Sequence, residues 1–138
     1  MEEALRGLPD PRLPHDIPNH VFIPPPRRIE KRISRLGWGK AAVYYSGADG
    51  KVFKTWVRLN PYKPAPTVMG RSRFIHPFED RVLTVREQAR LMGFPDYHVF
   101  KGSIESQYDQ VGEAVPVPLA RAVAREVLKH LRRKWGNT

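Results

Sequence analysis

The segment Arg81–Asp96 constrains the fold of this chain more than any other, because it marks both ends of a short helix. Thr84 can accept a hydrogen bond from a first-turn amide, and Glu87, three residues later, can accept one from the amide of Thr84, as in a capping box. Gly93 suits the left-handed conformation that often ends a helix, and the proline two residues later prevents continuation. The pattern predicts a helix over about Val85–Met92, followed by a turn.

Composition limits the chemistry that the chain can carry out. The chain has 138 residues and a formal net charge of +10, which suits one domain with a modest core and favours a polyanionic partner over a merely solvated basic surface. It contains no cysteine, so disulfides, thiolate metal sites and a cysteine nucleophile are excluded in this chain. The histidines are scattered without metal-ligand spacing, and we expect no metal site.

Targeting signals are not evident in the sequence. No apolar run approaches the roughly 18 residues that a membrane span requires. The N-terminal stretch MEEALRGLPD lacks the apolar core of a signal peptide. We therefore expect no membrane partner and a cytoplasmic, nucleoid-associated protein.

The rest of the chain predicts short helices and a hairpin, and hence an α+β fold. Residues 1–26 are rich in proline and predict an extended lead-in, either a linker or, as its apolar side chains favour, a strap across a neighbouring surface. Apolar spacing predicts a basic helix over Arg27–Leu36, and the runs around Ser46–Gly50 predict a β-hairpin. Residues 97–110 suggest a polar connector. A final helix is expected to begin at Pro118 and to carry an apolar stripe, Leu119, Val123, Val127 and Leu131.

Two stretches, in this order, resemble motifs of one enzyme family. Residues 81–96 contain Arg-x-Leu-Thr-x-Arg-Glu-x-Ala-Arg-Leu-x-Gly-Phe-Pro-Asp, which resembles the ninth motif of the cytosine-5 DNA methyltransferases. Residues 110–116, Gln-Val-Gly-Glu-Ala-Val-Pro, resemble the tenth, usually Gln-Ile-Gly-Asn-Ala-Val-Pro. Pro64–Val68 is similar to a strand that precedes a base-reading loop in the family, and His76 with Pro77 fits the position after that loop. The resemblance implies the C-terminal, target-recognition part of such an enzyme.

The residues that the family's chemistry requires are absent from this sequence. In the family, a cysteine thiolate attacks a flipped-out cytosine, a glutamate assists, and S-adenosylmethionine on a Gly-rich loop supplies the methyl group. This chain has no cysteine, no Glu-Asn-Val segment and no Gly-rich strand-to-helix loop. The resemblance therefore implies a part that binds duplex DNA and needs a catalytic domain or subunit carrying the Pro-Cys loop. It would be either a subunit of a split restriction-modification type enzyme or a piece of a longer chain.

The resemblance also implies an arrangement of parts. Residues 1–26 would lead into a recognition domain over residues 27–110, built on a small twisted antiparallel sheet with short helices. Residues 111–134 would hold the last motif and a C-terminal helix that docks on the separate catalytic domain.

The candidate DNA-contacting residues fall into three groups. Arginine offers two donors to guanine and serine can pair with several bases, so the main base-reading candidates are Gly70, Arg71, Ser72 and Arg73. The alternative for this loop is a surface turn with incidental charge. The end of the hairpin is a second recognition candidate, and an ordinary hairpin end explains it equally well: Lys40, Ser46 and Lys51. Phosphate contacts are expected of Arg28, Arg32 and Arg86, although each is also explained by a solvated position or, for Arg86, by pairing within the fold.

The last motif supplies the candidate cofactor contacts. In a complete enzyme this motif lies beside S-adenosylmethionine, so the resemblance implies that role for Gly112, Glu113, Ala114 and Val115. Glu113 stands where asparagine is usual, which removes an amide donor and weakens the expectation. Two other functions stay open: a stand-alone sequence-specific DNA-binding protein derived from such an enzyme, and an unrelated basic ribonucleoprotein component. The presence of both motifs in the family's order argues against the ribonucleoprotein component.

Overall fold

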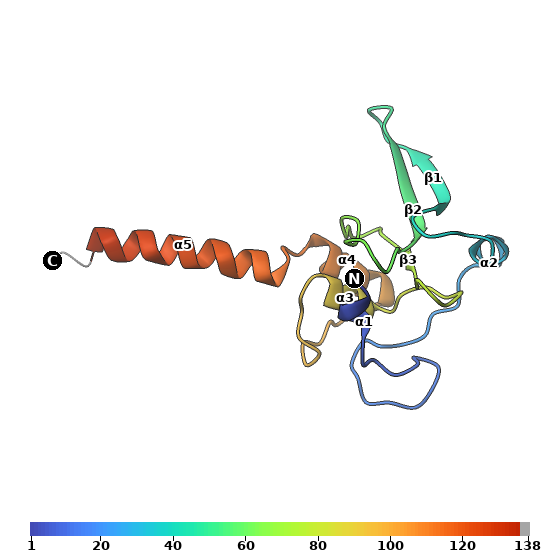
Figure 1. Ribbon diagram of the computed structural model, residues 1–138, viewed down its shortest axis with the longest axis horizontal. Coiled ribbons are helices and arrows are strands. Elements are labelled where there is room, and N and C mark those ends of the chain that lie inside the picture. The colour runs from blue at the N-terminus through green and yellow to red at the C-terminus, as the bar shows by residue number, and fades with distance from the viewer. Residues whose placement is uncertain (136–138) are drawn as a thin grey trace.

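The computed structural model describes residues 1–135 and shows an α+β architecture, from whose body a β-hairpin and a long C-terminal helix project in different directions (Figure 1). The expected fold class is confirmed. In chain order the elements are α1 (Glu2–Leu5), α2 (Arg27–Ile33), β1 (Ala41–Ser46), β2 (Val52–Arg58), β3 (Phe74–Ile75), α3 (Val85–Leu91), α4 (Ile104–Glu113) and α5 (Val117–Trp135).

The three strands form one mixed sheet in the order β1-β2-β3. β1 and β2 pair antiparallel, with Ala41 opposite Val57, as the predicted hairpin requires. β3 runs parallel to β2, with Phe74 opposite Val57. The sheet is therefore mixed rather than wholly antiparallel as expected, because the chain crosses the body after β2 and re-enters the sheet in the direction of β2.

Two apolar clusters form the core. The larger one joins α3 and α4 to the inner ends of β2 and β3, and includes Leu83, Val85, Ala89, Tyr108 and Val111. The smaller one packs Ile29 and Ile33 of α2 against Ala42, Ile75 and Val82. Because the two isoleucines are four residues apart, they bury one face of α2 and leave its cationic faces to solvent.

The helix predicted from the capping box is confirmed as α3. The Thr84 hydroxyl accepts a hydrogen bond from the Glu87 amide at 3.2 Å, and the Glu87 carboxylate accepts one from the Thr84 amide at 2.8 Å. Gly93 has the expected left-handed conformation, with φ of 77°. Glu87 also forms a buried ion pair with Arg81 at 2.7 Å. Burial alone would raise the pKa of the Glu87 carboxyl, but its bonds with Arg81 hold that pKa below its ordinary value.

The N-terminal residues lie on the body as an extended strap, which was the favoured expectation for them. The His20 ring is fully buried, with Nδ1 2.8 Å from Thr84 Oγ1 and Nε2 2.8 Å from the Pro9 carbonyl oxygen. The Asn19 side chain donates to the Phe100 carbonyl oxygen at 2.8 Å. These contacts tie the strap to the N-terminus of α3 and to the segment before α4.

The polar connector expected over residues 97–110 is wrong in its second half, where α4 begins. The Ser103 hydroxyl caps this helix by accepting a hydrogen bond from the Ser106 amide at 3.2 Å. Ile104, Tyr108 and Val111, at spacings of four and three residues, face the larger core cluster. The polar residues between them mask this apolar spacing in the sequence.

The C-terminal helix α5 begins one residue before the predicted Pro118 and has no buried residue. The apolar stripe predicted for this helix is confirmed, but no residue in the range 1–135 covers it. The residues of the stripe, Leu119, Val123, Val127 and Leu131, are 47–56% exposed. No helix in this part of the chain is both long and apolar enough to traverse a bilayer.

Candidate nucleic-acid interface

The β1–β2 hairpin beyond residue 42, here called the arm (residues 43–55), projects from the body (Figure 1). Tyr45 is stacked on Phe53, with ring centroids 5.4 Å apart, and this pair stiffens the two strands. At the tip, Ser46 and Lys51 are exposed, and the Lys51 ammonium lies 2.8 Å from the Asp49 carboxylate. A two-stranded ribbon of this kind has the width that the major groove of DNA admits. Both tip residues stay candidates for DNA contact.

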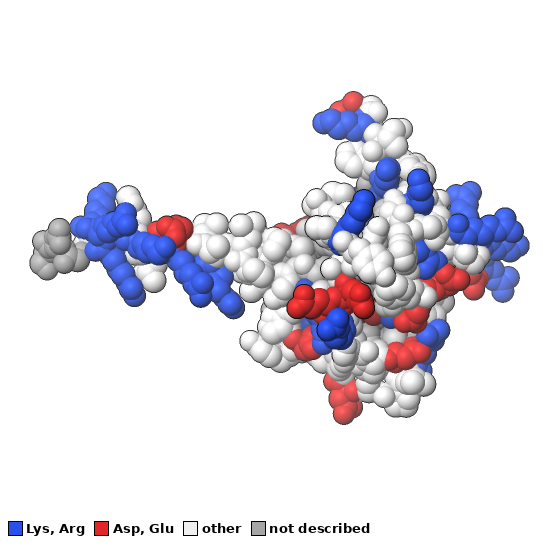
Figure 2. All heavy atoms as spheres, in the orientation of Figure 1, with Lys and Arg blue, Asp and Glu red and all other residues white. Residues whose placement is uncertain are grey.

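The cations of α2 form a second exposed surface. Figure 2 shows lysine and arginine side chains gathered over α2, on the right of the view. Arg28 is exposed, and Arg32 is exposed while one of its nitrogens donates to the Ala42 carbonyl oxygen at 3.0 Å. Lys40, also exposed, immediately precedes β1. Exposed cations beside the arm are suited to phosphate contacts that position a protein without reading sequence.

The structure separates the four residues of the expected base-reading loop. Arg71 is exposed, whereas Ser72 is buried and the Arg73 side chain is only 12% exposed. The Ser72 hydroxyl accepts a hydrogen bond from the Met69 amide at 3.0 Å, and Arg73 forms an ion pair with Glu105. Ser72 and Arg73 are thus committed to the fold rather than presented to a base, which corrects their expected role. Arg71 stays a base-reading candidate.

Arg86 also has a different role from the expected phosphate contact. Its side chain is fully buried and donates to the carbonyl oxygens of Pro18 at 3.0 Å and Pro95 at 2.9 Å, and to that of His98. Burial lowers the pKa of this guanidinium. Arg86 therefore fastens the strap and the turn after α3 to the body, which is the alternative that the sequence left open.

The last-motif residues lie at the end of α4, beside a groove of about 600 Å³ between residues 64–69 and the ends of α3 and α4. Gly112 packs on the backbone of Met69 and Gly70 so closely that an added Cβ would lie 2.0 Å from the Gly70 nitrogen. Glu113 is exposed and Val115 is 58% exposed, whereas Ala114 packs on the larger core. Close packing explains the glycine at 112, and the exposed pair stays a candidate for contact with a cofactor.

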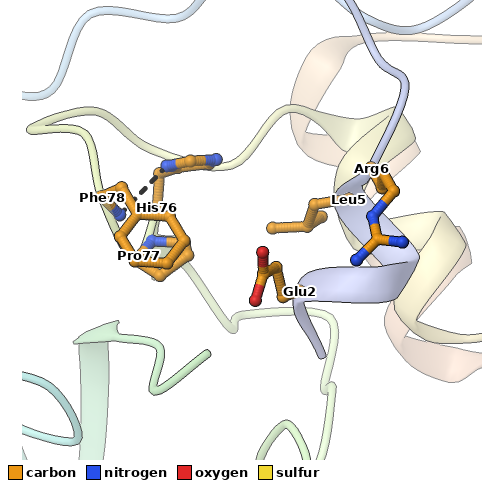
Figure 3. Close-up of a pocket in the computed structure, with 6 residues that line it drawn as sticks. All are labelled: Glu2, Leu5, Arg6, His76, Pro77 and Phe78. Carbon is orange, nitrogen blue, oxygen red and sulfur yellow. Dashed lines mark hydrogen bonds between the residues drawn. The ribbon is translucent and has the colours of Figure 1, made fainter. Parts of the chain in front are cut away.

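A smaller pocket, of about 180 Å³, lies between α1 and the turn after β3, and is lined by Glu2, Leu5, Arg6, His76, Pro77 and Phe78. Figure 3 shows Glu2 and Leu5 directed from α1 towards this turn. His76 Nδ1 accepts hydrogen bonds from the amides of Phe78 at 3.3 Å and Glu79 at 3.2 Å. Burial, and next the nearby positive charge of Arg81, lower the pKa of His76 below its ordinary value. The lining residues include no hydroxyl or thiol, and the pocket offers no nucleophile of those classes.

Sequence reasoning missed the residues that hold the 69–73 segment in place. Glu105 and Tyr108 project from α4, and the Arg73 guanidinium carbon lies 3.9 Å from the centre of the Tyr108 ring. The signal that could have revealed them is the Ser103 cap followed by apolar residues at helical spacing.

Comparison with known proteins gives one consistent family. The family model described as C-5 cytosine-specific DNA methylase matches residues 26–129. A candidate type II methyltransferase of Methanocaldococcus jannaschii is 54% identical over 117 residues, which cover 85% of this chain and 32% of that protein. A type II methyltransferase of Desulfomicrobium norvegicum is 36% identical over 132 residues, covering 79% of this chain and 32% of the relative.

A solved structure gives the same indication. A candidate DNA modification methyltransferase encoded within an Escherichia coli prophage is 30% identical, with a TM-score of 0.53, over 69% of this chain and 24% of that chain. The chain spans about a third to two fifths of the length of the type II methyltransferases it matches.

Proposed function

The chain belongs to the C-5 cytosine-specific DNA methylase family, and from this premise we propose that it is the DNA-recognition part of a cytosine-5 DNA methyltransferase. The observation that carries the proposal is the pairing of an exposed β-ribbon and cationic helix with a sequence that contains no cysteine. Such a chain has the means to hold duplex DNA but lacks the thiolate that attacks the cytosine ring.

DNA binding by this chain would combine two kinds of contact. The exposed cations of α2, with Lys40, would contact phosphates and make the affinity fall steeply with added salt. The arm would enter the major groove, where Ser46 and Lys51 at its tip face base edges. Arg71 would supply a further contact, since its exposed guanidinium can donate two hydrogen bonds to a guanine.

The methyl transfer would depend on residues outside this chain. S-adenosylmethionine supplies the methyl group in the family, and the catalytic part would hold most of it. Here, Glu113 offers a carboxylate acceptor and Val115 an apolar contact at the end of α4, while Gly112 faces the 69–73 segment instead. The residues present therefore fit a minor, one-sided contribution to a cofactor site.

The catalytic part would also cover α5. In the described residues, a helix of 19 residues with no buried side chain keeps an apolar stripe in water. Its aliphatic residues are about half exposed, so burying the rest of each side chain would contribute roughly 1 kcal/mol. The stripe is the surface on which we expect a catalytic domain or subunit to dock.

Reconstitution tests the proposal. The chain is mixed with a catalytic part that carries the Pro-Cys loop and the cofactor loop, taken from a close relative, and transfer of labelled methyl groups to duplex DNA is measured. Transfer that needs both components supports the proposal, and replacing the nucleophilic cysteine of the catalytic part by serine is the control for the source of the activity.

A second candidate function is a stand-alone DNA-binding protein derived from such an enzyme. The strap and the two core clusters favour it in one respect, because they give this chain a body that does not need α5. Site-selective binding by the chain alone, together with no transfer alongside any matched catalytic part, would favour this second function.

A further inference from the structure

We propose that Arg73 is a positioning residue that fixes the turn Met69–Ser72, here called the clasped turn, so that Arg71 is the one polar side chain of the turn offered to a base. This inference rests on the proposed function and names, within it, which arginine determines specificity and which one holds it in place.

The clasped turn is closed by its own hydrogen bonds. The Ser72 amide donates to the Met69 carbonyl oxygen at 2.8 Å, and the Met69 amide donates to the Ser72 hydroxyl at 3.0 Å. The two bonds fix the ends of the turn and put Gly70 and Arg71 at its apex. A turn closed in both directions presents its apex residue in one orientation.

Arg73 fastens this turn to α4. One of its terminal nitrogens donates to the carbonyl oxygens of Gly70 at 3.0 Å and Ser72 at 2.9 Å, and the other pairs with the Glu105 carboxylate. Its guanidinium also lies over the Tyr108 ring, 3.9 Å from the centroid. Tyr108 is itself buried and donates its hydroxyl to the Leu83 carbonyl oxygen at 2.7 Å. Arg73 therefore links the apex of the turn to a rigid part of the core. The planar guanidinium group, with donors on both terminal nitrogens, is needed to make these contacts together.

Backbone packing closes the turn from the other side. Gly112 of α4 lies directly against Met69 and Gly70, with no room for a Cβ. The buried Gln88 side chain of α3 donates to the Ser72 carbonyl oxygen at 3.3 Å. The clasped turn is thus held by α3, by α4 and by Arg73, and it cannot move without disturbing them.

Arg71 contrasts with Arg73 in every one of these respects. Its side chain is exposed, and it has no hydrogen bond or ion pair with any residue in the described range 1–135. All of its guanidinium donors are therefore available to a ligand. Arg71 therefore lies on the turn with its guanidinium free, and Arg73 holds that turn in place.

The test uses the full chain and duplexes enriched from a randomised library. The preference for the enriched site is the ratio of its affinity to that of scrambled duplex, measured for wild type, Arg71→Ala, Arg73→Ala, the double variant and Arg73→Lys. We expect Arg71→Ala to reduce the preference by roughly 5- to 150-fold, the range for one bidentate base contact. Arg73→Ala and Arg73→Lys should each reduce it as well, and the double variant should match Arg71→Ala alone. Arg121→Ala, on exposed α5, is the charge-matched control and should leave the preference unchanged.

The decisive readout is whether the losses of site preference in the two single variants are non-additive in the double variant, because a loss of stability alone does not produce non-additivity. If the two losses multiply in the double variant, Arg73 reads a base itself and the assignment is overturned. If Arg73→Ala fails to fold, Glu105→Gln, which removes the ion pair on exposed α4 surface, replaces it with the same expected outcome. An unchanged preference in Arg73→Lys and Glu105→Gln also overturns the assignment. A wild-type chain with no site preference overturns the proposed function and this inference together, whereas multiplying losses overturn this inference alone.

Discussion

Replacing Gly112 by alanine probes the packing that joins α4 to the clasped turn. An alanine Cβ at this position would lie 2.0 Å from the Gly70 nitrogen and 2.1 Å from the Met69 carbonyl carbon. Both are backbone atoms, so no side-chain rotation can relieve the overlap. Either α4 or the turn has to shift.

Two effects of opposite sign set the change in the free energy of unfolding. Alanine is better than glycine inside a helix by about 1 kcal/mol, and this gain applies because Gly112 is helical. Forcing a methyl group into a well-packed site typically destabilises by about 1–3 kcal/mol, and contact with backbone points to the upper end of that range. The packing effect exceeds the helix gain, so we expect a net loss of about 1–2 kcal/mol in the free energy of unfolding. For a chain of this size that corresponds to a fall in Tm of roughly 3–10 °C.

Thermal unfolding followed by circular dichroism measures the effect. Gly37→Ala is the matched control, because Gly37 has no heavy atom within 4 Å of an added Cβ, and its Tm should stay close to wild type. The site preference of Gly112→Ala should also fall, since the turn that carries Arg71 is displaced. A Gly112→Ala chain as stable as wild type or more so would refute the reasoning, because it would mean that helix propensity alone governs position 112.

Three further outcomes follow from the same structure. Thr84→Ala should lower the free energy of unfolding by about 1–2 kcal/mol, since the hydroxyl caps α3 and contacts buried His20; an unshifted Tm would contradict this. Burial lowers the pKa of His20 and His76 below 6.5, so below that pH the unfolded chain takes up protons that the folded chain resists, and stability falls as the pH drops. A Tm that is equal or higher at about pH 5.5 than at about pH 7.5 would argue against the buried neutral rings. Val127→Asp, on the exposed stripe of α5, should leave the Tm of the chain within the range of surface substitutions but weaken its association with a catalytic part, measured by calorimetry.

Features with local causes could be predicted from the sequence. The capping box of Thr84 and Glu87 and the left-handed Gly93 depend on neighbours within a few residues, and the sequence therefore predicted α3 nearly to its ends. The hairpin and the apolar face of α2 follow from turn composition and spacing in the same way.

Features with distant causes could not be predicted in this way. Arg73 turns inward because its partner Glu105 is 32 residues away, on a helix whose polar sequence hides its apolar spacing. Arg86 is buried because carbonyl oxygens of the strap and of the turn after α3 converge on it. Charge and motif position suggested DNA contact for both arginines, and only the tertiary arrangement distinguishes them from Arg71.

Amide hydrogen exchange of the chain with and without duplex DNA tests the central claim most directly. We predict slowed exchange in the arm, in α2 and at the clasped turn when DNA is bound, and unchanged exchange in the strap. Protection confined to the strap or to α5, with the arm unaffected, would contradict the claim that this chain holds DNA through its β-ribbon and cationic helix.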